Sequence, residues 1–349
     1  MWIVLSLIVF LMLFSTKYSI YHPDYISAQR CNAIKGIFIC LVFIRHIRSY
    51  ITGAVDGQFH VLDRITLFID GNLGQLIVAM FLFYSGFGLM ESLKKKGVAY
   101  VHNIPQKRLL PTLLNFDVAV IVFCLVDLLL GRALSVKSIL LSFVAWESVG
   151  NSNWYIFVIL CCYLLFYIIH LVIKKENISV LVLLLSLCLL GFMLAHLKPE
   201  WWYNTLFCFV FGCFYSWKII GREDVIIKHY LCILFLTIVF FVGLFILPGD
   251  FYCIKYNLLS VSFSFLVVLL TMKFQVQSVF LDWMGMNLFP LYIYQRLPMI
   301  VLSELGIGVI NQYSELFTLT AFVITLGLSY LFKFINVSRF LEKKSVHVK

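Results

Sequence analysis

Apolar runs of about 20 residues recur along almost the whole chain and restrict its fold more than any other feature. A transmembrane helix needs about 20 mainly apolar residues, so each run is long enough to cross a bilayer. Of the 349 residues, 62% are hydrophobic and only 13% are charged, whereas a soluble domain contains about 25% charged residues. The chain is therefore predicted to be an all-α, polytopic membrane helix bundle.

About eleven runs are predicted to be transmembrane helices, with stretches between them too short for a soluble domain. The longest outer stretches, 53–71 and 132–152, have room only for a turn or a short interfacial helix. The predicted spans are 1–16, 33–52, 72–90, 109–131, 153–173, 178–197, 202–220, 230–248, 255–273, 281–303 and 315–335.

The distribution of Lys and Arg predicts the orientation, because cytoplasmic loops of membrane proteins are enriched in these residues. An outside N-terminus puts most of the 27 Lys and Arg residues, including Lys94, Lys95 and Lys96, on the cytoplasmic side. We therefore predict a multi-pass protein of the cell membrane with a cytoplasmic C-terminus. We interpret the net charge of +10 as a sign of this topology, so no nucleic-acid partner is expected. The ten cysteines include no CxxC pair, so no metal site is predicted.

The predicted span 33–52 carries the most unusual polar residues, which are costly in a bilayer and often functional. Lys35 and His46 are eleven positions apart, about 1100° on a helix, which places them on one face about 16 Å apart along the axis. We predict that Lys35 binds an anionic group at the inner end and that His46 acts as a base toward the outer end. In the alternative, Lys35 extends to the inner surface while Arg45, His46 and Arg48 cap the outer end.

The segment from Arg30 through Lys35 to His46 resembles the opening of acyltransferase family 3, the membrane O-acyltransferases. The family's signature there is Arg or Lys, ten residues, and then His, which Lys35 and His46 match. Further elements that resemble the family are Met80–Phe87, Lys107-Arg108 before Pro111, Asn153-Trp154-Tyr155, and Gly285-Met286-Asn287 with Leu291–Tyr294. Together they cover residues 29–335.

The resemblance implies a ten-span bundle that takes an acyl group, commonly acetyl, from a cytoplasmic donor and transfers it to a glycan hydroxyl at or beyond the outer face. Residues 1–28 would be an extra N-terminal helix and linker, 29–335 the acyltransferase domain, and 336–349 a basic cytoplasmic tail. No bound cofactor is expected, because acyl-CoA is a co-substrate. The expected partners are the lipid bilayer, acyl-CoA, and an envelope glycan or lipid-linked saccharide. Asn32 and Gln295 stand where many members carry Asp and His, so neither is assigned a catalytic role.

Acyl transfer to a hydroxyl needs a base and a group that stabilises the developing oxyanion. We expect His46 to be the base or a transient acyl acceptor. The residues expected to bind the donor phosphates are Lys35, Arg30, Lys107 and Arg108. The residues expected to bind the acceptor or stabilise charge are Arg45, Arg48, Ser85, Glu147, Trp154, Tyr155 and Tyr292. For Ser85 the alternative is close helix packing, and for Glu147 and its aromatic neighbours it is a place at the membrane interface.

A transporter or flippase of a polar or lipid-linked solute is the main alternative, because charged residues within a bundle can also line a solute path. Transporters often contain two halves with Gly- or Pro-interrupted spans in matching positions. The sequence contains no such pair, which favours an enzyme. A third alternative, a polysaccharide polymerase, would be expected to have a larger outer loop.

Overall fold

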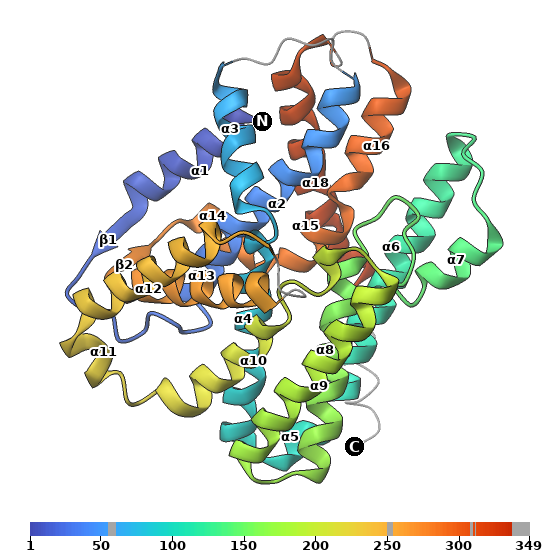
Figure 1. The fold of residues 1–349 in the computed structure, drawn as a ribbon. Coiled ribbons are helices and arrows are strands. Elements are labelled where there is room, and N and C mark those ends of the chain that lie inside the picture. The colour runs from blue at the N-terminus through green and yellow to red at the C-terminus, as the bar shows by residue number, and fades with distance from the viewer. Residues whose placement is uncertain (55–60, 250–253, 308–309, 311, 337–349) are drawn as a thin grey trace.

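The computed structural model describes residues 1–54, 61–249, 254–307, 310 and 312–336. Nearly all of this part of the chain is helical, as predicted (Figure 1). Its two strands have three residues each and pair with one another. The predicted basic tail, 336–349, lies outside the described residues except for Asn336.

The elements follow one another from N- to C-terminus with short connections. In the first half they are α1 (Trp2–Ser15), β1 (Thr16–Tyr18), α2 (Arg30–Ala54), α3 (Val61–Leu73), α4 (Leu76–Lys96), α5 (Val98–His102), the π-helical turn η1 (Pro105–Leu109), α6 (Leu110–Leu129), α7 (Val136–Ser142) and α8 (Trp154–Val172). In the second half they are α9 (Glu176–Leu197), η2 (Glu200–Trp202), α10 (Phe207–Phe214), the π-helical turn η3 (Tyr215–Ile219), α11 (Asp224–Lys228), α12 (Tyr230–Ile246), α13 (Ile254–Lys273), β2 (Phe274–Val276), α14 (Val279–Met286), α15 (Leu288–Tyr294), α16 (Arg296–Leu305) and α18 (Ser314–Ile335).

Six of the described helices are long and apolar enough to cross a membrane: α4, α6 together with η1, α8, α9, α13 and α18. Each corresponds to a predicted span, so the chain is a multi-pass membrane protein. Two further helices, α1 and α12, are apolar but shorter. The predicted span 202–220 is helical only in part, because η2 and a turn come before α10, which continues directly into η3. The outer stretches 53–71 and 132–152 contain the short helices α3 and α7.

The prediction of a single helix over 281–303 is wrong, because this stretch forms α14, α15 and α16. The ends of α14, at Met286, and of α15, at Tyr294, each lie four residues before a proline, Pro290 and Pro298. A proline ring clashes with the carbonyl group four residues before it and interrupts the helix there. The two prolines therefore divide the stretch into three short helices.

Glycines bring two pairs of helices into direct backbone contact. Gly36 of α2 and Gly285 of α14 lie where these two helices cross. Gly86 of α4 and Gly212 of α10 lie at a second crossing. A Cβ atom on any of the four would lie only 1.9 to 2.1 Å from a carbonyl oxygen of the facing helix. Small residues allow helices in a membrane to approach this closely. The crossings fix the positions of α2 and α4, which line the candidate site.

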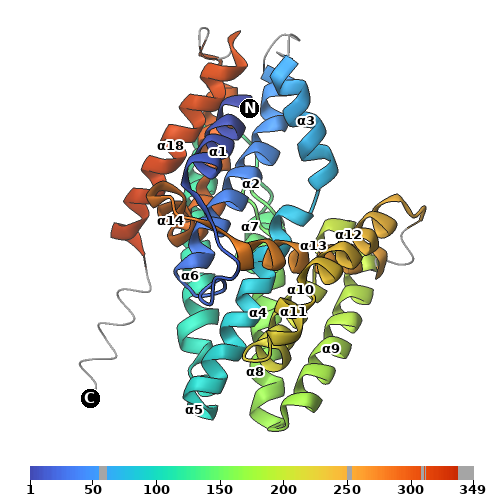
Figure 2. The same cartoon turned by 90° about the vertical axis from the view of Figure 1, so that its left-hand side faces the viewer.

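The N-terminal helix α1 is attached to the bundle at both of its ends (Figure 2). At its start, the amine of Met1 forms an ion pair with the buried Asp63 of α3 at 3.0 Å. The indole of Trp2 donates a hydrogen bond to Glu315 of α18 at 3.2 Å. At its other end, β1 pairs antiparallel with β2. The residues that precede α2 are thus held against α3, α18 and β2.

Candidate active site

Two neighbouring cavities lie between α2, α4, η1, α8 and α15. One, of about 610 Å³, is lined by Lys35 and is called here the Lys35 cavity. The other, of about 490 Å³, is called the Tyr292 cavity. Both are lined by Phe81, Ser85, Arg108, Tyr163 and Leu288, so these five residues form a shared wall.

Lys35 and Arg108 have aromatic neighbours in place of a carboxylate. The ammonium group of Lys35 lies 5.5 Å from the centroid of the Tyr84 ring. Arg108 interacts with the hydroxyls of Tyr100 and Tyr163. Among the described residues, no carboxylate forms an ion pair with either cation. Charges within a membrane bundle are costly without a partner, so these two favour an anionic ligand.

The described lining of the Tyr292 cavity has a net positive charge, whereas that of the Lys35 cavity also contains Asp24, Glu91 and Glu223. The described lining of the Tyr292 cavity includes Lys107, Arg108 and Lys333 and no Asp or Glu, together with the amides of Asn115 and Asn287. Ammonium groups bind phosphate as point charges, and a guanidinium group binds it through paired hydrogen bonds. The composition of this cavity therefore suits a phosphate-bearing ligand, and the binding of donor phosphates by Lys107 and Arg108 stays a prediction.

Arg30 does not line either cavity. Its Nε donates a hydrogen bond to Asp24 at 2.7 Å in the linker before α2. This hydrogen bond lowers the pKa of Asp24, and the positive charge of Arg30 adds to the effect. The charge of Arg30 is thus compensated within the protein, which separates it from the other three predicted donor-binding residues.

His46 lies behind the far wall of the Tyr292 cavity. Its Nδ1 is 3.5 Å from the hydroxyl of Ser152, and its ring centroid is 6.3 Å from that of Tyr292. Tyr292 in turn lies 5.3 Å from the ring of Tyr155, and both tyrosines line the cavity. The hydroxyl of Tyr292 is buried, and the side chain of Ser152 lies near it. The predicted residues His46, Tyr155 and Tyr292 are therefore brought together.

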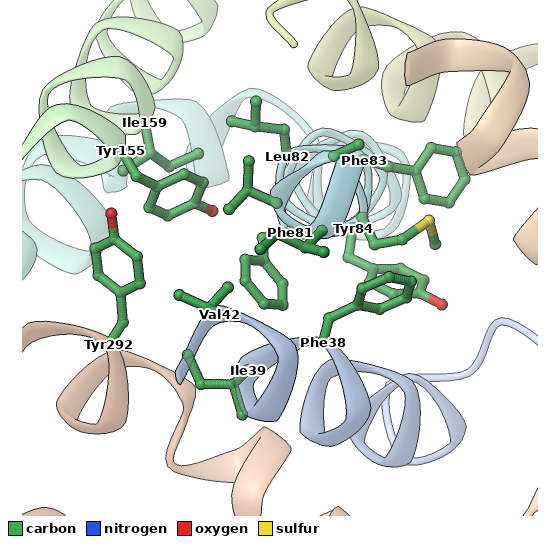
Figure 3. Packing of buried hydrophobic residues seen from close by; sticks show 14 of the residues in the cluster. Phe38, Ile39, Val42, Phe81, Leu82, Phe83, Tyr84, Tyr155, Ile159 and Tyr292 are labelled. Atoms are coloured by element: carbon green, nitrogen blue, oxygen red, sulfur yellow. The ribbon is translucent and has the colours of Figure 1, made fainter. Parts of the chain in front are cut away.

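The direct route along α2 from Lys35 to His46 is closed. Figure 3 shows Phe38 and Val42 extending from α2 toward the side chains of α4, including Phe81. Phe38 is 6% exposed and Val42 is 2% exposed, so no open channel follows this face. The space between the two predicted ends lies to the side of α2, past the shared wall and through the Tyr292 cavity.

Arg45 and Arg48 share one buried carboxylate. Their Nη1 atoms lie 3.0 and 3.3 Å from Oδ2 of Asp70 in α3, and Asp70 is 6% exposed. Asp63, seven residues earlier in the same helix, is also buried. The spacing of these two aspartates on one face of a short helix was the available signal that Asp70 points into the bundle.

The remaining predicted residues either line a cavity or lie outside both cavities. Ser85 lines both cavities and interacts with the hydroxyls of Tyr155 and Tyr163, while its neighbour Gly86 makes the close helix contact. Glu147 forms an ion pair with Lys198 at 3.1 Å. The predicted residues that line neither cavity are Arg30, Arg45, His46, Arg48, Glu147 and Trp154. Of these, His46 alone has a ring contact with Tyr292, and Trp154 contacts the ring of Tyr155.

Comparison with known families decides which class of protein contains this arrangement. The model of the acyltransferase domain, acyltransferase family 3, matches residues 29–334. The chain belongs to acyltransferase family 3. The resemblance seen in the sequence is thus confirmed, and the protein is a membrane acyltransferase. The match begins at residue 29, directly before Arg30. In this acyltransferase, α1, β1 and most of the linker between β1 and α2 therefore lie outside the matched region. No match to a curated protein or to a solved structure was found.

Proposed function

We propose that the acyltransferase moves an acyl group, most simply acetyl, from cytoplasmic acyl-CoA to a hydroxyl of an envelope polysaccharide or related glycan. One observation carries the proposal. A cavity lined by three cations and no described carboxylate reaches Tyr292, and the imidazole of His46 lies directly behind that residue. Phosphates bind well to the cations of this cavity, and the imidazole beside Tyr292 suits proton transfer.

The donor's phosphates bind at Arg108, with Lys35 on one side of the shared wall and Lys107 on the other. The pantetheine arm extends through the Tyr292 cavity and brings the thioester to Tyr155 and Tyr292. Holding the thioester at this point, away from bulk water, lowers the entropic cost of the reaction. The route replaces the straight path along α2, which Phe38 and Val42 fill.

In the chemical step, His46 removes the proton of the acceptor hydroxyl as its oxygen attacks the thioester carbonyl. The new C–O bond forms, the C–S bond breaks, and the leaving thiolate takes the proton from His46. The buried hydroxyl of Tyr292 donates a hydrogen bond to the developing oxyanion. Ser152 orients the imidazole through Nδ1. Arg45 and Arg48, held by Asp70, fix the outer end of α2 against α3.

We also assign the N-terminus to the outside of the cell membrane and the C-terminus to the cytoplasm. Lys107 and Lys333 line the same cavity, which supports one common side for the loop after α5 and the end of α18. Both belong to the basic groups that the distribution of charge assigns to the cytoplasm.

The test is transfer of labelled acetyl from acetyl-CoA to envelope glycans in inverted membrane vesicles. A general base contributes about 10²- to 10⁴-fold, so His46→Ala should reduce transfer by at least about 100-fold. The matched control is His196→Ala. His196 is exposed at the end of α9, and its Nδ1 contacts the Phe192 carbonyl, so this variant should keep full activity. Full activity in His46→Ala at normal membrane levels would exclude the assignment.

The alternative of a transporter or flippase is supported by one element, the proline-divided stretch α14 to α16. Broken helices line substrate paths in many transporters. If a range of donors and acceptors yields no label, uptake or flipping of polar and lipid-linked solutes is the measurement to make. Loss of such transport in the Lys35→Ala and Arg108→Ala variants would then assign the cavities to a solute path.

A further inference from the structure

The residues that precede the family-matched region follow a fixed course beside α13. In β1, Lys17 lies opposite Gln275 of β2. Beyond the strand, the amide of Ser19 donates a hydrogen bond to the carbonyl of Lys273 at 2.9 Å, and that of His22 donates to Met272 at 2.8 Å. Figure 1 shows this pairing at the edge of the molecule, remote from α6 and α7. We call residues 16–28 the N-terminal segment.

The N-terminal segment then forms one wall of the Lys35 cavity. Every residue from Pro23 to Ala28 lines this cavity. Asp24 accepts hydrogen bonds from Arg30 at 2.7 Å and from Gln275 at 3.2 Å. The wall is therefore attached to α2 on one side and to β2 on the other.

Tyr25 connects this wall to the opposite side of the cavity. Its hydroxyl lies 2.8 Å from that of Tyr215 in η3 and donates to Glu223 at 3.3 Å. Tyr25 is 3% exposed and Tyr215 is fully buried. Glu223 also lines the Lys35 cavity. One buried hydroxyl thus connects the wall formed by residues 23–28 to Tyr215 and Glu223, and Glu223 belongs to the facing part of the lining.

We propose that the Lys35 cavity holds the adenine-nucleotide half of the acyl donor and that the N-terminal segment, held by Tyr25, encloses it. This inference rests on the proposed function. The cavity volume of about 610 Å³ lies in the range of small-molecule sites. Its lining also contains three carboxylates, each with a partner: Asp24 and Glu91 form ion pairs with Arg30, Lys94 and Lys95, and Glu223 accepts from Tyr25. Lys35 and Arg108, which have no described carboxylate partner, bind the diphosphate, with Arg108 at the wall shared with the Tyr292 cavity. The nucleoside then extends toward the N-terminal segment, and the pantetheine arm lies on the other side of the shared wall.

Tyr25 is a positioning residue in this proposal, since it acts through the wall that it holds. Its removal should weaken binding of the nucleotide and leave the reacting end of the donor unchanged. Two donors separate these effects: acetyl-CoA, and S-acetyl-pantetheine, which lacks the nucleotide. We expect Tyr25→Phe to raise KM for acetyl-CoA at least threefold, with kcat within twofold of the wild-type value and KM for S-acetyl-pantetheine unchanged.

Tyr18→Phe is the matched control from the same segment. Tyr18 is 64% exposed, and its ring contacts Phe274 at 5.4 Å, a contact that phenylalanine preserves. This variant should leave both KM values unchanged. If Tyr25→Phe does not accumulate in the membrane, Tyr215→Phe removes the partner hydroxyl of Tyr25 and should show the same selective rise in KM.

Calorimetric titration of the detergent-solubilised protein with CoA separates this inference from the proposed function. If the wild-type protein does not bind CoA, the donor assignment and the inference both fail. If the wild-type protein binds CoA and Tyr25→Phe binds it with the same Kd, the inference alone fails. An equal rise in KM for both donors would also overturn it, because the residue would then act on the fold as a whole.

Discussion

Four basic residues predicted to bind the donor differ in whether the protein already compensates their charge. Arg30 donates to Asp24 at 2.7 Å, whereas Lys35 and Arg108 form no ion pair with a described carboxylate and face cavities. Their ion-pair partners therefore separate residues that the sequence pattern treats alike. Only the three that line the cavities retain charge for a ligand.

Arg30→Gln and Arg108→Gln test this difference. We expect Arg108→Gln to raise KM for acetyl-CoA about tenfold, a loss of about 1.4 kcal/mol in binding, because the proposed site places the guanidinium group against the donor phosphates. Arg30→Gln should change KM by less than twofold. Initial rates at varied acetyl-CoA in inverted vesicles measure both values. Similar KM values in the two variants would contradict the distinction.

The contribution of the Arg30–Asp24 ion pair to stability depends on pH. The pKa of Asp24 is lowered in the folded protein, so the contribution is complete above the unfolded-state pKa and is lost as pH falls through the folded-state value. Both side chains are partly exposed, at 30% and 46%, and such pairs contribute at most about 1 kcal/mol. The pair thus determines the course of the linker more than the stability of the bundle.

Pairs of helices are positioned by the small residues where they cross. Replacing Gly86 with alanine would place a Cβ 2.0 Å from the carbonyl oxygen of Phe209, so α4 and α10 must move apart. Overpacking of this kind costs about 1–3 kcal/mol. We therefore expect Gly86→Ala to lower the unfolding temperature of the solubilised protein and to reduce transfer, since α4 carries Ser85 of the shared wall.

Gly88→Ala in the same helix is the matched control for stability. A Cβ at Gly88 would meet no atom within 4 Å, and alanine favours a helix by about 1 kcal/mol over glycine. This variant should therefore retain or slightly raise the unfolding temperature. Equal destabilisation by the two substitutions would show that the α4–α10 crossing is not the cause.

The breaks between α14, α15 and α16 could be predicted in part from the sequence. Pro290 and Pro298 stand four residues after the ends of α14 and α15, so the division of 281–303 follows from local chemistry once the prolines are weighed against the apolar run. The closed face of α2 could not be predicted in this way. Periodicity places Lys35 and His46 on one side of the helix, but only packing shows that Phe38 and Val42, which lie between them, are covered by side chains of α4.

The bundle as a whole is expected to place its basic groups in the cytoplasm. Fusions to alkaline phosphatase, which folds only where its disulfides can form, should be active after residue 134 and inactive after residue 174. Phosphatase activity in intact cells, normalised to the amount of fusion protein, measures this. The opposite pattern at these two points would invert the orientation and move the Lys35 cavity to the outer side.

The sequence by itself determined that this is a helical membrane protein resembling acyltransferase family 3. The first conclusion follows from the apolar runs and basic clusters, and the second from motifs such as the spacing of Lys35 and His46. These properties depend on composition and local periodicity, which need no knowledge of neighbours. The tertiary structure alone decided that Asp70 neutralises Arg45 and Arg48, that Tyr292 connects a cavity to His46, and that Tyr25 reaches Tyr215. Such contacts join residues far apart in the chain, and they exist only after the helices have packed.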